Sequence, residues 1–250
     1  MSRCWLTGAS SGLGAALALR LLEQGHQVAL GGRRADNLLP LQAQFPRQVM
    51  LAIGDIDDPG QVARIVGDIE RNLGALDLVI LNAGTCEYLE PDAFDPVLVE
   101  RVIRTNLLGV SHCLAAALPL LRRGERPHLV VTGSSVTWLA LPRAGAYGAS
   151  KAALRYLVES LRIDLIREGI DVTLVNPGFV DTPLTRRNDF PMPQLWSAER
   201  AARHVAQRLP RRPLEINFPA AFTLLLRLLG ALPGRWWLKL GQRLARTPKD

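Results

Sequence analysis

The sequence predicts a single α/β domain with a parallel sheet, and three observations support this fold class. A short apolar run at residues 4–6 leads into a glycine-rich turn at 7–14 and then into an alanine-rich segment with helical spacing at 15–22. Strand-like and helical segments continue to alternate beyond it, which is typical of β-α units. Residues 76–81 are almost continuously apolar, as in a parallel strand covered on both faces. A chain of 250 residues is long enough for one such domain.

The remaining elements follow with short connections. In chain order we expect strands at residues 4–6, 27–31, 49–53, 76–81, 128–132, 172–175 and 214–218. We expect helices at 15–22, 35–45, 61–73, within 97–121, and at 147–167 and 198–209. In a parallel sheet of this kind, ligands bind at the carboxyl ends of the strands. The turns after the strands are therefore where functional residues are expected.

The composition is that of an ordinary globular protein, with 48% apolar and 21% charged residues. Cys4, Cys86 and Cys113 have no metal-ligand spacing and cannot all pair, which favours a reducing compartment. The first strand begins too close to Met1 for a signal peptide. We therefore expect a cytoplasmic protein without a metal site.

The glycine-rich turn, Thr-Gly-Ala-Ser-Ser-Gly-Leu-Gly, lies between a strand and a helix. Gly8, Gly12 and Gly14 lack Cβ atoms, so the backbone can turn sharply and approach a phosphate closely. The following helix directs its unpaired N–H groups and positive dipole end toward that phosphate. The spacing Gly-x-x-x-Gly-x-Gly differs from the common dinucleotide fingerprint, and the alternative is a plain turn of small residues.

The ends of the second and third strands suggest which nucleotide binds. In a dinucleotide fold, an acid at the end of the second strand holds the adenosine ribose, whereas arginine accommodates a 2′-phosphate. Here Arg33 and Arg34 stand where the acid would be, which favours NADP over NAD. The alternative is a solvated loop end. Asp55, after the third strand, either accepts a hydrogen bond from the adenine amino group or caps the next helix.

Three polar residues further along are candidates for chemistry. Asn106 lies inside a helical segment, where asparagine either marks a local distortion or occupies an exposed face. Tyr147 and Lys151 are four residues apart and share a helix face. A lysine ammonium beside the phenol should lower the tyrosine pKa and suit it to general acid/base work. Taken alone, such a pair is usually structural.

Residues 185–196 are polar, contain prolines and are expected to be irregular. Phe190, Met192 and Trp196 are the large apolar groups of this segment. It is either a lid over an apolar substrate or a plain packed loop.

Taken together, these residues resemble the short-chain dehydrogenase/reductase family over about residues 1–218. The motifs are the glycine turn, Asn82-Ala83-Gly84, Asn106, Ser134, Tyr147-x-x-x-Lys151 and Pro177-Gly178. The resemblance implies a Rossmann-type, doubly wound parallel sheet and a catalytic domain at 1–218. It also implies that Tyr147 is the acid/base and that Ser134 holds the substrate oxygen. Lys151 would lower the Tyr147 pKa and bind the nicotinamide ribose, and Asn106 would hold a water of a proton relay.

The same resemblance assigns the cofactor site. Asp55 matches the acid that contacts adenine, Arg33 the residue that binds the 2′-phosphate in NADP-preferring members, and Pro177-Gly178 the segment facing the nicotinamide. The full predicted cofactor set is Gly8, Ser10, Ser11, Gly12, Leu13, Gly14, Arg33, Asp55, Ile56, Asn82, Ala83, Gly84, Tyr147, Lys151, Pro177, Gly178, Val180 and Thr182. The predicted substrate residues are Ser134, Tyr147, Phe190 and Trp196.

The predicted function is NADP(H)-dependent interconversion of a carbonyl and an alcohol, with a small lipophilic substrate. The alternatives are a 3-oxoacyl reductase acting on a carrier-linked substrate and a non-catalytic NADP(H)-binding regulator. The family commonly assembles as dimers or tetramers through the helices that carry Asn106 and Tyr147, so a homo-oligomer is expected.

Residues 219–250 form a predicted helical extension that leaves the family pattern. From Arg208 onward the chain has nine basic and two acidic residues, so this part carries the whole net charge of +7. The body is neutral, which gives no reason to expect nucleic-acid binding. The apolar run at 220–232 is too short to span a bilayer, but leucine and tryptophan among basic residues suit a membrane interface. The alternatives are packing on the body or a partner subunit, and docking of an acidic carrier protein.

Overall fold

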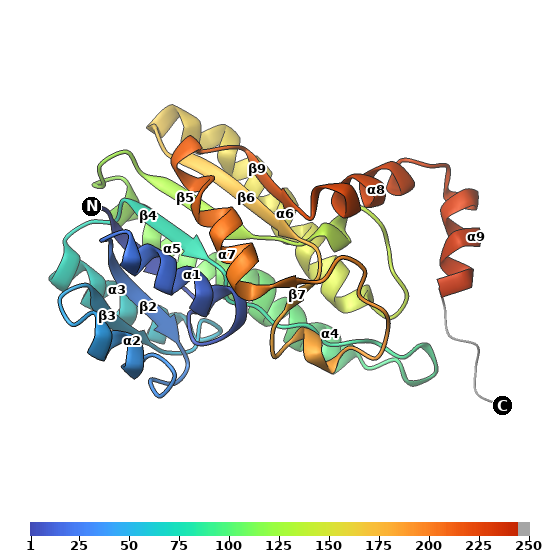
Figure 1. Cartoon of the computed structure of the whole chain (residues 1–250), viewed down its shortest axis with the longest axis horizontal. Helices are drawn as coiled ribbons and strands as arrows, with labels where there is room; N and C mark the ends of the chain where they lie inside the picture. Colours follow the sequence, from blue (N-terminus) through green and yellow to red (C-terminus); the bar gives the residue numbers. More distant parts are fainter. Residues whose placement is uncertain (245–250) are drawn as a thin grey trace.

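The core of the molecule is a seven-stranded parallel sheet (Figure 1). The computed structural model describes residues 1–244. The strand order is β3-β2-β1-β4-β5-β6-β9, so the chain first winds outward from β1 and then crosses back to β4. The bounds are β1 Arg3–Leu6, β2 Gln27–Gly32, β3 Val49–Ile53, β4 Leu78–Leu81, β5 His128–Thr132, β6 Asp171–Pro177 and β9 Glu215–Phe218.

Helices cover both faces of this sheet. The described helices are α1 Gly12–Glu23, α2 Leu39–Gln44, α3 Pro59–Leu73, α4 Pro96–Ile103, α5 Val110–Leu121, α6 Gly145–Leu165 and α7 Ala198–Ala206, followed by α8 Ala220–Gly230 and α9 Gly234–Leu244. Buried side chains of α1 and α7 share one core cluster, and those of α3, α5 and α6 share the other. The predicted doubly wound, Rossmann-type α/β fold is confirmed.

Two predicted helices differ in their extent. The helix expected at 35–45 is the shorter α2, which begins with Pro40 in its first turn. The long helix expected within 97–121 is α4 and α5 joined by a π-helical segment, Arg104–Gly109. Asn106 lies inside that segment, so the distortion predicted for it is present.

A small ribbon lies outside the main sheet. β7, Val180–Asp181, pairs with β8, Trp196–Ser197, in parallel register. The ribbon closes the base of the irregular segment between residues 182 and 195, which carries a short 3₁₀ turn at Thr185–Arg187.

The chain continues past β9 as α8 and α9, which extend away from the sheet at one end of the molecule (Figure 1). Residues 245–250 of the predicted extension lie outside the described residues. Within residues 1–244, no helix is long and apolar enough to cross a membrane.

Candidate active site

A cleft of about 640 Å³ lies along the carboxyl ends of the strands, where the winding direction changes between β1 and β4. The turns after β1, β2, β3, β4, β5 and β6 all contribute to its lining. Every residue of the predicted cofactor set lines it, together with Ser134. The fold therefore brings residues separated by up to 174 positions, from Gly8 to Thr182, into one site.

The glycine turn is tightly fixed by its surroundings. Gly8 and Gly12 have φ values of +67° and +53°, which glycine adopts without strain. A Cβ atom on Gly14 would lie 2.0 Å from the Gly8 carbonyl oxygen and 2.6 Å from Asn82 Nδ2. Ser11 precedes α1 without a side-chain capping hydrogen bond, so the first amides of the helix are left without a side-chain partner at the cleft. This is the geometry of a phosphate site.

Asn82 holds the ends of three strands together. Its backbone N–H donates to Thr7 Oγ1 at 3.0 Å, and its Nδ2 donates to the Gly8 carbonyl at 3.3 Å. Its Oδ1 accepts from Thr132 Oγ1 at 3.3 Å. The glycine turn after β1 is thereby tied to the turns after β4 and β5. Thr7, the first residue of the glycine-turn motif, and Thr132 also line the cleft, although neither was assigned a binding role from the sequence.

Arg33 and Asp55 both lie at the nucleotide end of the cleft. Arg33 is exposed, and within residues 1–244 its guanidinium has no hydrogen bond or ion pair. Asp55 accepts from the backbone N–H of Asp57 at 3.1 Å. The cap of α3 is Asp58, whose Oδ1 accepts from the Gly60 N–H at 2.8 Å. The capping alternative for Asp55 is therefore wrong, and its carboxylate remains in the cleft lining.

Asn106 lies behind the cleft and is fully buried. Its Nδ2 donates to the Thr85 carbonyl and to Ser150 Oγ, each at 2.9 Å, and its Oδ1 accepts from the Thr85 N–H at 2.8 Å. The exposed-face alternative is excluded by this burial. A Cβ on Gly84 would lie 3.0 Å from Asn106 Oδ1 and 3.4 Å from Lys151 Nζ. The Asn106 and Lys151 side chains therefore both approach Gly84, where a larger residue would collide with Asn106.

Tyr147, Lys151 and Ser134 meet at the inner end of the cleft. Lys151 Nζ donates to the Thr132 carbonyl at 2.9 Å and lies 6.0 Å from the centre of the Tyr147 ring. Ser134 Oγ accepts from the Val136 N–H at 3.2 Å, and its hydroxyl is also hydrogen-bonded to Tyr147. Tyr147 and Lys151 project from the first two turns of α6, and Ser134 lies in the turn after β5.

The prediction that Lys151 lowers the Tyr147 pKa is wrong for this structure. Burial raises the pKa of Tyr147 well above its usual range, although a hydrogen bond from Ser134 acts in the opposite direction. Burial also lowers the pKa of Lys151 to about 8. The phenol therefore keeps its proton at neutral pH, while the ammonium loses its proton more easily than usual.

A cluster of aromatic rings lies beside Pro177-Gly178. Phe179 lies 6.1 Å from Phe190 and 5.5 Å from Phe222, and Phe190 lies 5.5 Å from Tyr88, between ring centres. A Cβ on Gly178 would lie 2.9 Å from Phe222 Cδ1, so the cluster packs directly on this segment. Phe190, a predicted substrate residue, lies in this cluster beside the cleft and not in the cleft lining, so its role stays a prediction. Phe222 was not predicted, because it belongs to the extension.

Trp196 does not lie with this cluster, which corrects its prediction as a substrate residue. It stacks on Phe218 at 5.3 Å and meets the His204 ring edge-on at 5.1 Å. The Arg200 guanidinium covers its ring at 4.0 Å. Trp196 packs against the core beneath α7, because β8 directs it there, and it is absent from the cleft lining.

The segment that carries Phe190 is clamped to the body. Tyr88 donates its hydroxyl proton to Asn188 Oδ1 at 2.8 Å. Arg143 lies 5.3 Å over the Tyr88 ring and pairs with Asp189 at 2.8 Å and with Glu90 at 2.5 Å. These contacts fix the irregular segment to the body beside the aromatic cluster. Its role as a lid stays a prediction.

Comparisons with known proteins agree with this architecture. Residues 3–191 match the family described as short chain dehydrogenase, and the chain belongs to that family. It is 35% identical over 231 residues to an uncharacterized oxidoreductase of Myxococcus xanthus, which covers 91% of each chain. It is 35% identical over 191 residues to the 11-beta-hydroxysteroid dehydrogenase 1A of Arabidopsis thaliana, 74% of this chain and 54% of the relative.

A solved short chain dehydrogenase of Burkholderia cenocepacia, in complex with NADP, superimposes with a TM-score of 0.83. It is 27% identical and covers 98% of each chain. The protein is therefore an oxidoreductase whose fold binds a nicotinamide cofactor.

Proposed function

We propose that the protein is an NADP(H)-dependent reductase that interconverts a carbonyl and an alcohol on a small lipophilic substrate. The observation that carries the proposal is the meeting of Ser134, Tyr147 and Lys151 at the inner end of a cleft whose outer end is a glycine cradle. A regulator that only bound the nucleotide would not need this polar set beside an aromatic pocket.

The residues present fit an NADP cofactor. The turn at Gly8, Gly12 and Gly14 can pack as it does only without Cβ atoms, because a Cβ at each position would strike backbone or a neighbouring side chain. The N-terminus of α1 that follows the turn suits a phosphate. Arg33 presents a free guanidinium at the end of β2, where a planar fork of donors suits a 2′-phosphate. Asp55 would accept from the adenine amino group, and Lys151 would bind the nicotinamide ribose.

A bound nicotinamide cofactor supplies the hydride. Ser134 and Tyr147 donate hydrogen bonds to the substrate carbonyl oxygen, on which negative charge develops. Tyr147, which its raised pKa keeps protonated in the resting site, then transfers its proton to that oxygen. Lys151, with a pKa of about 8, returns a proton to the tyrosine near neutral pH. Asn106 would position a water over Gly84 that connects Lys151 with solvent.

A lipophilic substrate is supported by the aromatic cluster beside the cleft. Tyr88, Phe179, Phe190 and Phe222 present apolar surface next to Pro177-Gly178, which faces the nicotinamide in this proposal. Aromatic walls with a few directed polar groups are typical of small-molecule sites.

We also propose a cytoplasmic homo-oligomer. Exposed apolar side chains on and just after α6, Tyr156, Ile163 and Ile166, are 78%, 71% and 67% exposed. A second copy could cover them.

The test is NADPH consumption against a panel of long-chain ketones and aldehydes, offered free, CoA-linked and carrier-linked. The proposal expects alcohol formation matched to NADPH loss with free substrates. Turnover only with carrier-linked substrates would instead show a 3-oxoacyl reductase. Tight NADPH binding without consumption across the panel would contradict the proposal and favour a regulator.

A further inference from the structure

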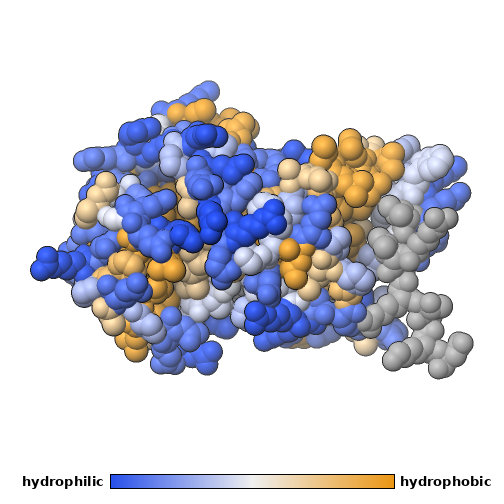
Figure 2. Space-filling view, in the orientation of Figure 1, coloured by the Kyte–Doolittle hydropathy of each residue, from blue (hydrophilic) through white to orange (hydrophobic). Residues whose placement is uncertain are grey.

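The two helices after β9 have a surface that the chemistry of the cleft does not use. On α8, Thr223 and Leu226 are buried against the body, whereas Leu224, Leu225 and Leu228 are 57%, 51% and 59% exposed. These three leucines share the outer face of the helix, since their spacing is i, i+1 and i+4. Figure 2 shows hydrophobic side chains gathered over this end of the molecule.

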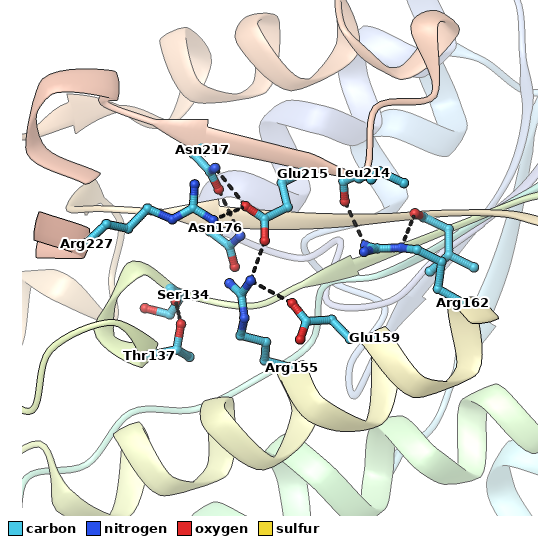
Figure 3. A network of polar contacts seen from close by, with 11 residues as sticks. Ser134, Thr137, Arg155, Glu159, Arg162, Asn176, Leu214, Glu215, Asn217 and Arg227 are labelled. Atoms are coloured by element: carbon cyan, nitrogen blue, oxygen red, sulfur yellow. Dashed lines mark hydrogen bonds and ion pairs between the residues drawn. The ribbon is translucent and has the colours of Figure 1, made fainter. Parts of the chain in front are cut away.

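The outer face is held in place by a polar network beneath α8 (Figure 3). Arg227 Nη2 donates to Glu215 Oε2 at 2.8 Å, and its guanidinium lies 4.7 Å over the Trp138 ring. Arg155 from α6 pairs with the same Glu215. Arg227 thus interrupts the apolar run because it anchors the helix to the body.

The last residue of α8, Gly230, packs directly against the backbone of Trp138. A Cβ on Gly230 would lie 1.8 Å from the Trp138 carbonyl oxygen, in the turn that begins at Ser134. The exposed leucines are therefore displayed on a helix fixed to the catalytic turn. A well-anchored helix with an apolar outer face indicates a surface meant to be covered.

The charged residues of α8 and α9 themselves are all basic. The sequence has no Asp or Glu from residue 219 to residue 249. On α9, Arg235 and Lys239 are exposed next to Trp236 and Leu238, which are 68% and 51% exposed. Tryptophan, leucine and basic residues together are typical of helices that lie in a membrane interface.

We propose that the outer face of α8 and α9 docks on the surface of an anionic lipid bilayer. The leucines and Trp236 would enter the interface, while Arg235 and Lys239 would pair with lipid phosphates. Charge argues against a second copy as the occupant, because two such faces meeting about a two-fold axis would set cations opposite cations with no acid between them.

The docking surface is continuous with the substrate pocket. Phe222 lies on the same helix as the exposed leucines and packs on Gly178 and Phe179. Docking would therefore hold the aromatic pocket beside the lipid, where lipophilic molecules concentrate.

The experiment is co-sedimentation of the full chain with vesicles of phosphatidylcholine, with and without phosphatidylglycerol. We expect at least tenfold more binding to the phosphatidylglycerol vesicles, with a decrease at high salt because exposed charges are screened. The double variant L225E/L228E should lose at least tenfold in binding. The control is L39E, which places one glutamate on an exposed leucine of α2, away from the proposed docking face. The single variants L225E and L228E, each with one added charge, are compared with it.

NADPH binding and thermal unfolding of each variant are measured in the same samples, so a misfolded variant or a failed cofactor site is recognised separately. Equal sedimentation of wild type and L225E/L228E, or no binding by wild type, would overturn the proposal. So would a loss of self-association in L225E/L228E without vesicle binding in wild type, which would identify a second copy as the occupant.

Discussion

The proposed nucleotide end and the proposed substrate end of the site are built in opposite ways. The nucleotide end consists of backbone and small residues from the strand ends that line the cleft, packed so closely that a Cβ on Gly14 would lie 2.0 Å from the Gly8 carbonyl oxygen. The substrate end is the aromatic cluster beside the cleft, in which Tyr88, Phe179, Phe190 and Phe222 meet only in the folded chain. The first end depends on the absence of side chains and the second on their bulk.

This difference predicts different sensitivities to mutation. Closely packed backbone cannot move to accept a new side chain, so a single added methyl group should disrupt cofactor binding. A pocket of rings can repack, so loss of one ring should weaken substrate use and leave the cofactor unaffected.

Gly14→Ala should have the largest effect on the nucleotide end. The new Cβ would strike the Gly8 carbonyl and Asn82 Nδ2, neither of which is a flexible side-chain end. We expect NADPH affinity to fall at least roughly a hundredfold, and the free energy of unfolding to drop by about 1–3 kcal/mol. Fluorescence titration and thermal unfolding measure these. Gly145→Ala is the control, since nothing lies within 4 Å of its Cβ position.

Arg33→Ala should come next. Loss of charge-assisted hydrogen bonds worth about 1.5–3 kcal/mol would weaken NADPH binding roughly 10- to 100-fold and leave NADH binding unchanged. Titration with both cofactors checks this. Arg34→Ala is the neighbouring control, because Arg34 is absent from the cleft lining. Equal weakening of both cofactors would remove the argument for a 2′-phosphate site.

Phe222→Ala should act on the substrate end alone. We expect about a tenfold increase in KM for a long-chain ketone from the loss of apolar contact, with the Kd for NADPH changed less than about twofold. Steady-state kinetics and cofactor titration separate the two. An increase in the NADPH Kd as large as that in KM would show that the two ends are not independent.

Lys151→Met should have the smallest effect of these variants. We expect it to raise the free energy of unfolding. Burial lowers the folded pKa of Lys151 to about 8 from 10.5, so between these values the unfolded chain binds the proton and the folded chain does not. The free energy of unfolding therefore falls as pH drops from 10.5 to about 8 and stays reduced below it.

Removing the amine removes this penalty, offset in part by an unpaired Thr132 carbonyl. We expect the Tm at pH 7 to rise by roughly 4 °C, and the gain to shrink toward pH 10. Lys151→Arg keeps a charge and should show no gain. A lower Tm for Lys151→Met at pH 7 would contradict the burial argument.

The contrast between the backbone-built nucleotide end and the aromatic cluster also explains which features could be predicted from the sequence. Glycine spacing and strand ends report local backbone requirements, so the sheet was predicted from residues near one another in the chain. The family resemblance supplied the predicted cofactor residues, and the fold places all of them in the lining of one cleft. Trp196 was assigned to the substrate site from its size and position in an irregular segment, but the β7–β8 pairing directs it into the core. Phe222 was missed because only packing of α8 on Gly178 places it at the site.

The Tyr147 pKa shows a second limit. Helical spacing predicts that Tyr147 and Lys151 share a face, but desolvation depends on everything packed around them. Here burial is the largest cause of the shift and raises the Tyr147 pKa, so the phenol stays protonated and is not a ready phenolate.

Tyr147→Phe tests the central claim most directly, because the hydroxyl is the one group on which both ends of the cleft converge. NADPH binding and NADPH consumption are measured on the same sample with a ketone that the wild type reduces. The account predicts an unchanged Kd for NADPH and a fall in turnover of roughly 10²- to 10⁴-fold, the usual contribution of a positioned acid. Turnover equal to that of the wild type would contradict it.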